Sequence, residues 1–312
     1  MTIRIGHLST FYHTAILLQA RGDADARLGT PIDWRLMGTG PAIMQAFQKG
    51  ELDLAYIGLP PAIIGMDQGV DVVCVAGGHV EGTVMSGKPG WRGFPEEPDI
   101  AAVLAQFSAK TIGVPGKGSI HDVILNDAIE RSGLRGSIEI RNYPWADLVT
   151  EAVVKDQVAA AIGTPALAIA IRRFANGKVL CPPSELWPDN PSYGIVARRD
   201  FLSQSPGLVE LFLLVHEEAA QFIRSSPREA ARLIADYVGV IDQAFVFDTL
   251  ALSPKYCAAL TDRYISATMR FLPVLKKFGY IKSELSEDRI FQRDLIERIH
   301  PGGDHYGDGI RE

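Results

Sequence analysis

The chain has 312 residues and a formal net charge of −6, with 47% hydrophobic and 22% charged residues. This balance is typical of a globular protein that is long enough to bury more than one core. It argues against a nucleic-acid-binding protein, whose binding surface should be basic. It leaves an anionic ligand open, because a local site can oppose the overall charge.

The cysteines and the N-terminus bear on the compartment in which the protein works. Cys74, Cys181 and Cys257 lie far apart, without the spacing of a metal site or a disulfide framework. The longest uncharged stretches, such as residues 158–171, are too short for a transmembrane helix. The sequence starts directly with a predicted strand rather than a signal peptide. We therefore expect either a periplasmic or cell-surface protein whose leader has been removed, or a cytoplasmic protein.

The first eighty or so residues alternate short apolar runs with helical patterns. Strands are predicted at residues 3–8, 32–37, 54–57 and 70–76, with helices at 13–20 and 41–49 and a third from residue 62. Alternation of this kind indicates βαβ units and a parallel sheet. Residues 82–86 are predicted to cross to a second unit.

The second unit repeats the pattern and is followed by a helical region. Strands are predicted at residues 111–114, 138–143, 159–162 and 179–181, with helices at 100–107, from 119, at 145–155 and at 166–174. Residues 190–196 are predicted to cross back. Helices are then predicted at 207–224, from 227, at 254–277 and at 286–299, before a glycine-rich, charged tail at 301–312 that we expect to be disordered.

The stretch from Met37 to Met66 organises the expected site. It reads as turn, helix, strand, turn and helix. Both turns follow consecutive parallel strands, at the edge of the sheet where open α/β proteins bind small ligands. Free N–H groups at the helix starts favour an anion there. The alternative is that these are ordinary glycine turns of an α/β protein.

Four segments carry a resemblance to a known family. They are GTGPAIMQAFQKGELDLAYIGLPPAI from residue 38, VDVVCVAGGHVEGTVM from 70, KTIGVPGKGSIHDVIL from 110 and KKFGYIKSELSEDRIF from 276. Their order and spacing resemble the nitrate/sulfonate/taurine-type solute-binding proteins of ABC importers. The chain departs from that family at residues 21–27, where a Gly-Leu-Phe segment is usual.

The resemblance implies an α/β fold of two doubly wound domains joined by a two-strand hinge, with a helical C-terminal region. Domain 1 would comprise residues 1–84 and 194–300, and domain 2 residues 85–193. The two domains would face each other across a ligand cleft and close on it through the hinge. The resemblance also implies a monomer that delivers its ligand to an ABC permease.

The expected ligand-binding residues are those that follow the predicted strands or lie on the returning crossover. They are Ser9, Thr10, Phe11, His13, Gly38, Thr39, Gly40, Gly58, Leu59, Gly78, His79, Lys117, Gly118, Ser119, His121, Asp147, Gly163, Thr164 and Tyr193.

Ser119 is the sharpest of these candidates. A hydroxyl and free N–H groups at a helix start can hold an oxyanion, and Lys117 lies nearby as a point charge. The alternative is that Ser119 only caps the helix, with Asp122 completing a capping box. Asp147 could accept a hydrogen bond from a cationic part of the ligand, or could simply favour the helix start. Trp145 could wall the cleft or pack against the sheet.

Three histidines, His13, His79 and His121, also follow predicted strands. One reading is a metal or proton-sensing site. The other, which we favour, is hydrogen bonding to ligand or backbone, because no pair has the spacing of a helical metal site. We therefore predict no bound metal and no cofactor.

No catalytic motif is present: there is no G-x-S-x-G elbow, H-E-x-x-H pair or P-loop. The prediction is a substrate-binding protein for a small, anionic organic or inorganic solute, not an enzyme. Two alternatives stay open. One is a cytosolic biosynthetic enzyme of the same fold, like the thiamine-pyrimidine or menaquinone-pathway enzymes, and the other is a ligand-sensing domain.

Overall fold

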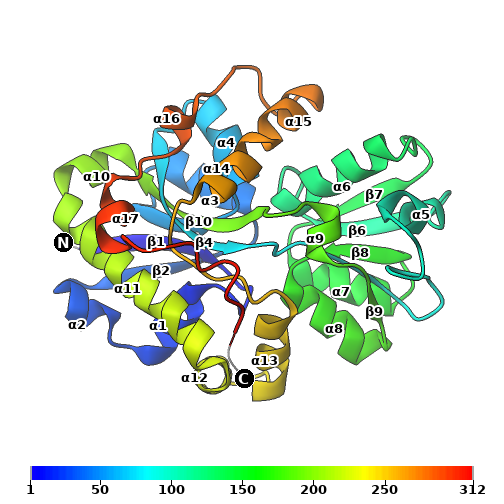
Figure 1. Ribbon diagram of the computed structural model, residues 1–312, viewed down its shortest axis with the longest axis horizontal. Coiled ribbons are helices and arrows are strands. Elements are labelled where there is room, and N and C mark those ends of the chain that lie inside the picture. Colours follow the sequence, from blue (N-terminus) through cyan, green and yellow to red (C-terminus); the bar gives the residue numbers. More distant parts are fainter. Residues whose placement is uncertain (1, 311–312) are drawn as a thin grey trace.

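In the computed structural model, which describes residues 2–310, the chain forms two five-stranded sheets side by side (Figure 1). We call them sheet A and sheet B. Sheet A has the order β2-β1-β3-β10-β4, and sheet B the order β7-β6-β8-β5-β9. The strands of sheet A are β1 (Ile3–Leu8), β2 (Ile32–Met37), β3 (Leu54–Ile57), β4 (Val72–Val80) and β10 (Pro191–Arg198). Those of sheet B are β5 (Val84–Gly87), β6 (Thr111–Pro115), β7 (Glu139–Tyr143), β8 (Ala160–Gly163) and β9 (Lys178–Cys181).

Both sheets are mixed rather than purely parallel. Strand β1 pairs in parallel with β2 and β3, whereas β10 runs antiparallel between β3 and β4. Sheet B repeats this arrangement, with β6 parallel to β7 and β8, and β5 antiparallel to β8 and β9. The chain therefore passes from sheet A to sheet B between β4 and β5 and returns between β9 and β10.

Helices cover both faces of each sheet (Figure 1). Around sheet A lie α1 (Thr14–Arg21), α2 (Ala24–Leu28), α3 (Gly40–Gln48) and α4 (Leu59–Asp67), and around sheet B α5 (Ile100–Ala105), α6 (Ile120–Arg131), α7 (Ala146–Val154), α8 (Pro165–Ala175) and α9 (Pro183–Leu186). The C-terminal region adds α10 (Arg199–Gln204), α11 (Pro206–Ser225), α12 (Pro227–Val238), α13 (Gln243–Leu252), α14 (Asp262–Met269), α15 (Phe271–Lys277), α16 (Glu287–Ile290) and α17 (Asp294–Ile299). The predicted fold class is confirmed, including the helical C-terminal region.

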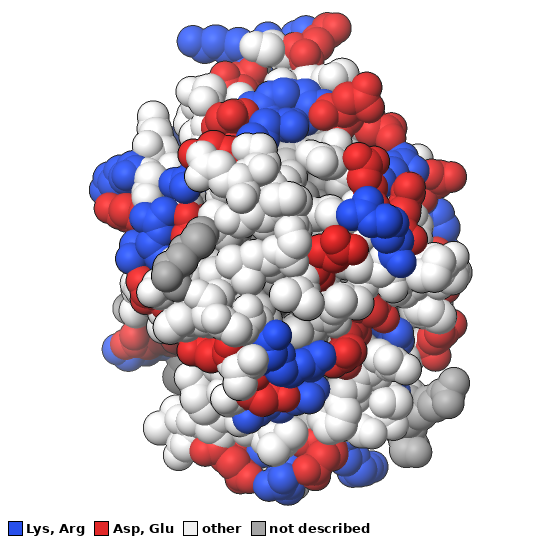
Figure 2. All heavy atoms as spheres, turned by 90° about the vertical axis from the view of Figure 1, so that its left-hand side faces the viewer, with Lys and Arg blue, Asp and Glu red and all other residues white. Residues whose placement is uncertain are grey.

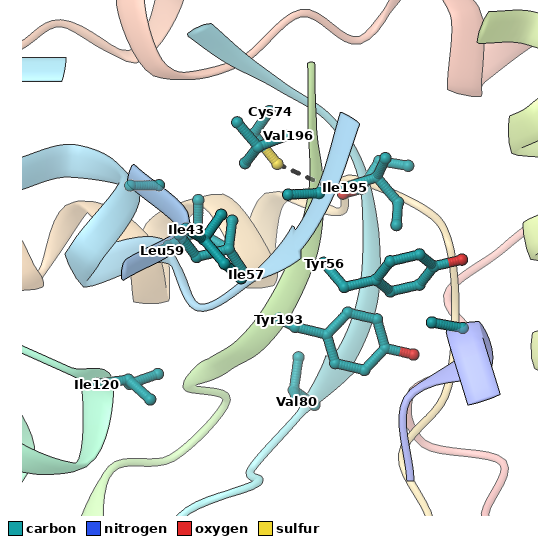
Figure 3. Close-up of a cluster of buried hydrophobic side chains, with 14 of the residues drawn as sticks. Ile43, Tyr56, Ile57, Leu59, Cys74, Val80, Ile120, Tyr193, Ile195 and Val196 are labelled. Carbon is teal, nitrogen blue, oxygen red and sulfur yellow. Dashed lines mark hydrogen bonds between the residues drawn. The ribbon is translucent and has the colours of Figure 1, made fainter. Parts of the chain in front are cut away.

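One continuous core joins the two units. Tyr56 of β3 and Tyr193 of β10 are fully buried, and their ring centroids lie 5.7 Å apart (Figure 3). Ile120, at the start of α6, belongs to the same apolar cluster although α6 packs on sheet B. The two sheets are therefore held together by apolar contacts as well as by their two connections.

Strands β1, β2 and β3 occupy the predicted residues, but β4 is longer than predicted. It continues through Gly78 and His79 to Val80, where a turn was expected. The pairing partner explains the difference, because His79 lies opposite Tyr193 of β10, which arrives more than a hundred residues later. Gly78 and His79 are therefore strand residues, not residues of a turn after a strand.

The C-terminal region differs from the prediction in three places. Helix α13 was not predicted, and the helix expected over 254–277 begins only at Asp262, where Thr261 caps α14. Residues before it instead run beside β4, with Tyr256 bridging His79. The helix expected over 286–299 is two short helices, α16 and α17.

The tail was expected to be disordered, yet part of it is anchored. Tyr306 is only 5% exposed, stacks on Tyr264 and donates a hydrogen bond to the Ala259 carbonyl. Residues 311 and 312 of the predicted tail, and Met1 of the predicted first domain, lie outside the described residues.

The surface carries no extended patch of one sign on the face drawn in Figure 2, where basic and acidic side chains alternate. Among the described residues, none of the helices has the length and apolar character that crossing a membrane requires.

Candidate functional site

A small cavity lies where the two sheets face each other. Its volume is about 50 Å³, room for a few water-sized groups. Sheet A and its helices contribute Leu8, Ser9, Thr10, Tyr12, His13, Gly38, Thr39, Gly40, Gly58, Pro61 and Ser192 to the walls. Sheet B and its helices contribute Pro115, Ser119, Ile120, His121, Ala146 and Thr164. The site therefore exists only while the two units are together.

Five helices start at the cavity. The N-cap residues of α1, α3, α4, α6 and α8 are His13, Thr39, Gly58, Ser119 and Thr164, and all five line the walls. Each of these helices has eight or more residues, so each turns the positive end of its dipole toward the cavity. Part of the first-turn N–H groups is already used, because three of the N-cap side chains accept one each, from Ala42, Asp122 and Leu167. No Lys, Arg, Asp or Glu contributes to the walls. The positive potential there comes from the backbone, and it favours a negatively charged group.

Two polar side chains of the walls have unused hydrogen-bonding capacity. Thr10 Oγ1 and His13 Nδ1 are buried and make no hydrogen bond within the protein. Thr10 is 6% exposed and His13 only 1% exposed. Leaving buried polar atoms unpaired costs about 1–3 kcal/mol each, so such atoms commonly mark a place where another molecule completes the bonding.

The two histidines of the cavity are uncharged at neutral pH. Burial lowers the pKa of His121 to about 4 and the pKa of His13 well below its usual value. A neutral imidazole offers one donor and one acceptor nitrogen. His121 Nδ1 uses one of these on Thr83 Oγ1, 3.0 Å away. These rings can therefore hydrogen-bond a ligand but do not attract it by charge.

The third predicted histidine, His79, does not line the cavity. It lies in β4 behind Tyr12, with the two ring centroids 5.0 Å apart, and its Nε2 bonds to the Ser253 carbonyl at 2.6 Å. Within residues 2–310, no group of three or more His, Cys, Asp or Glu side chains is arranged to hold a metal ion. The three histidines thus do not form one site.

Several other predicted site residues lie outside the cavity walls. Phe11 packs against Phe245 of α13, with ring centroids 6.0 Å apart, and Tyr193 is fully buried in the core. Lys117 is exposed and lines two neighbouring hollows instead. The remaining ones outside the walls are Leu59, Gly78, Gly118, Asp147 and Gly163.

The predicted residues that do line the cavity are Ser9, Thr10, His13, Gly38, Thr39, Gly40, Gly58, Ser119, His121 and Thr164. Among the wall residues absent from the predicted set are Tyr12 and Ser192, whose hydroxyl oxygens are 2.8 Å apart. Tyr12 lies between the predicted residues Phe11 and His13, whereas no local pattern in the sequence singles out Ser192. It reaches the cavity only because β10 returns beside β3 and β4.

Ser119 is placed as a cap, and its hydroxyl is already used. Its Oγ accepts from the Asp122 N–H at 3.3 Å and donates to the Pro115 carbonyl at 2.8 Å. We therefore expect Ser119→Ala to lower the free energy of unfolding by about 1 kcal/mol, the usual value of an N-cap. Ser119→Ala should change ligand affinity less than Thr39→Ala does. The hydroxyl of Thr39 accepts a hydrogen bond from the Ala42 N–H but donates none within the protein, so its proton is free for a ligand. Chemical denaturation and titration calorimetry of both variants check this, and a larger affinity loss for Ser119→Ala would contradict it.

Two glycines lie where the two units touch, and one of them, Gly38, lines the cavity. A side chain on Gly38 would meet the Pro144 carbonyl oxygen at 2.9 Å and the Trp145 ring at 3.2 Å. A side chain on Gly116 would meet Thr39 Cγ2 at 2.7 Å. Gly38 and Thr39 follow β2, whereas the other three residues follow β6 and β7 of sheet B. We call this pair of contacts the mouth, because it is where the two units touch directly beside the cavity.

Comparison with known proteins gives the family. A model of the NMT1-like family matches residues 1–239. The chain belongs to the NMT1-like family. A Brucella abortus protein that carries the name of a binding protein is 24% identical over 243 residues, which cover 76% of this chain and 72% of that protein.

Solved structures confirm the fold of this NMT1-like protein. The alkanesulfonate-binding protein SsuA of Xanthomonas axonopodis pv. citri, bound to MOPS, superposes with a TM-score of 0.80 at 18% identity, covering 94% of this chain and 98% of that one. The ligand-binding component of an ABC-type import system from Staphylococcus aureus, with zinc bound, gives a TM-score of 0.78 at 15% identity and covers 97% and 100%. The family resemblance predicted from the sequence is confirmed.

Proposed function

We propose that this NMT1-like protein is a substrate-binding protein that captures a small solute with an anionic group between its two units and presents it to an ABC importer. The observation that carries the proposal is the convergence of five helix N-termini on one cavity whose walls hold no charged side chain. Backbone N–H groups are suited to an oxyanion and unsuited to a cation. The unpaired Thr10 and His13 supply further hydrogen bonds.

The two structural relatives hold different ligands, one a sulfonate buffer and the other zinc. The walls of this cavity favour the anion. They offer no carboxylate and no thiolate, and their only imidazoles are His13 and His121. Zinc sites in proteins use three or four such ligands.

The domain division is part of this proposal. Domain 1 would be residues 1–84 with 194–300, domain 2 residues 85–193, and the two would swing about the connections between them, as hinged binding proteins do. The mouth would open to admit the solute and seal it on closure. The protein would act as a monomer outside the cytoplasm, and its closed form would be what the permease recognises.

A thermal-shift screen tests the proposal directly. The panel would contain nitrate, sulfate, short alkanesulfonates and carboxylates, with zinc chloride as the competing class. A ligand at about 100 times its dissociation constant adds about 2.7 kcal/mol, enough to raise Tm by several degrees. A stabilising anion that is recovered chemically unchanged supports the proposal. Stabilisation by zinc alone, or a recovered product, would overturn it in favour of a metal carrier or an enzyme.

Thr10 should contribute directly to the binding of the anion that the screen identifies. We expect Thr10→Val to weaken binding of the stabilising anion by about 10-fold or more, since hydrogen bonds to charged groups contribute about 1.5–3 kcal/mol. Titration calorimetry measures the change. Thr111→Val, a matched substitution on β6 whose hydroxyl bonds to Glu139, should leave the affinity unchanged. Equal affinities for the Thr10 variant and the wild type would remove Thr10 from the site.

A further inference from the structure

A hydrogen bond joins the C-terminal region to the wall of the cavity. Tyr280, which follows α15, donates to Asp122 Oδ2 in the first turn of α6 at 2.6 Å. Helix α15 contacts both α4, on sheet A, and α6, on sheet B (Figure 1). Asp122 is only 1% exposed. The bond therefore crosses between the two units, from a partly exposed tyrosine to a buried carboxylate.

The Tyr280 end of this bond is fixed to the first unit. Asp67, at the end of α4, accepts from the backbone N–H groups of Lys282 and Ser283 at 3.0 and 2.8 Å. These residues follow Tyr280 by two and three positions, so the segment moves with α4. Burial, and then the hydrogen bond to Asp122, raise the pKa of Tyr280, which keeps its hydroxyl protonated as a donor.

The Asp122 end is fixed to the turn that carries cavity residues. The same Oδ2 accepts from the Gly118 N–H at 2.8 Å, and Oδ1 accepts from Asn142 Nδ2 at 2.9 Å. Its backbone N–H is capped by Ser119, which lines the cavity. A displacement of Asp122 would therefore move the turn over residues 116–119, one side of which forms the mouth.

We propose that Tyr280 and Asp122 form a latch that holds the two units closed and fixes the β6–α6 turn against the cavity. The proposal rests on the proposed function in so far as the two units open and close around a solute. When they separate, the buried Asp122 carboxylate loses one of its donors, and this cost is absent from the closed form. Tyr280 is thus a positioning residue that acts on the ligand through Asp122 and its turn.

The test measures the closed-to-open ratio without any ligand. Spin labels would be placed on cysteines introduced at Glu51 and Lys155, both exposed and one in each unit. The three native cysteines are buried. Tyr280→Phe should lower the closed-to-open ratio in the measured distance distribution about 10-fold or more, the effect of removing one hydrogen bond to a charged group. Tyr237→Phe, which removes a hydrogen bond to Gln19 within the first unit, should leave the distribution unchanged.

Three results would overturn the latch. They are an unchanged distribution in Tyr280→Phe, an equal shift in Tyr237→Phe, and a wild-type protein that shows only the open distance. With any solute that the thermal-shift panel identifies, Tyr280→Phe should also dissociate about 10-fold faster or more at an unchanged association rate. If no solute binds, the proposed function fails, whereas the distance measurement still decides the latch.

Discussion

Gly116→Ala is expected to weaken solute binding by about 10-fold or more. The new Cβ would lie 2.7 Å from Thr39 Cγ2 and 3.0 Å from Thr39 Cβ, across the mouth. A threonine side chain is stiff at its first torsion and cannot turn away easily. Overpacking of this kind costs about 1–3 kcal/mol, and here the cost falls on the closed form because Thr39 and Gly116 belong to different units. Titration calorimetry with the stabilising anion measures the loss.

Thr39→Ser supplies the matched control, because it keeps the capping hydroxyl and deletes the methyl group that clashes. The double variant Gly116→Ala, Thr39→Ser should recover part of the lost affinity, whereas Thr39→Ser alone should bind nearly as well as the wild type. Gly116 has a φ of +26°, so alanine also adds local backbone strain. That strain is the same in both Gly116 variants, so recovery by Thr39→Ser isolates the contact across the mouth. A loss that Thr39→Ser does not reduce would contradict the closing role of this contact.

Gly78→Ala is expected to have the largest effect on stability. The new Cβ would lie 2.0 Å from Tyr193 Cε2 and under 3 Å from two more atoms of that ring. Tyr193 cannot yield, because it is fully buried, packs on His13 at a centroid distance of 4.1 Å and accepts a hydrogen bond from the Thr14 N–H. We expect the free energy of unfolding to fall by about 3 kcal/mol or more, the upper end for overpacked cores. Tm should then drop by roughly 6 °C or more.

Gly207→Ala is the matched control for Gly78→Ala. Gly207 lies in the first turn of α11 with no atom near the position of an added Cβ, so its replacement should change the free energy of unfolding by less than about 0.5 kcal/mol. The pair separates two roles for Gly78. The sequence suggested a ligand contact, which would lower affinity at constant Tm. The packing against Tyr193 instead predicts lower Tm, and a variant as stable as the wild type would refute it.

Local signals in the sequence were sufficient for the first strands and, to within one residue, for the helix starts at the cavity except that of α4, which begins at Leu59 rather than residue 62. Strand β3 is a run of four apolar residues between turn signals, and its bounds follow from that alone. The cap at Ser119 follows from residue type and position, whereas Thr39 became a cap only because α3 starts at Gly40, one residue before the predicted start. Because helix starts beside parallel strands collect at one edge of a sheet, ten of the nineteen predicted site residues line the cavity.

The features that were missed or predicted wrongly depend on contacts between segments that are distant in the sequence. Phe11 lies three residues after the end of β1 and its neighbours Thr10 and Tyr12 line the cavity, but its own ring packs against Phe245 of α13. Helix α13 itself was missed because its apolar residues, such as Val246, Phe247 and Leu252, are spread around the helix and do not keep to one face. Gly78 has the residue type of a turn, and only pairing with β10 makes it part of a strand. No local pattern encodes such pairings.

The place of β10 in sheet A has a consequence for how the chain assembles. β10 lies between β3 and β4, yet it is translated after every strand of sheet B. Until residue 198 has emerged from the ribosome, β4 has no strand to join it to β3, whereas sheet B is already complete at residue 181. Folding during synthesis would therefore finish the second unit first and leave the first unit as two separate pieces. The edges of β3 and β4 stay open to wrong pairing for that interval, which makes the arrival of β10 the step most exposed to aggregation.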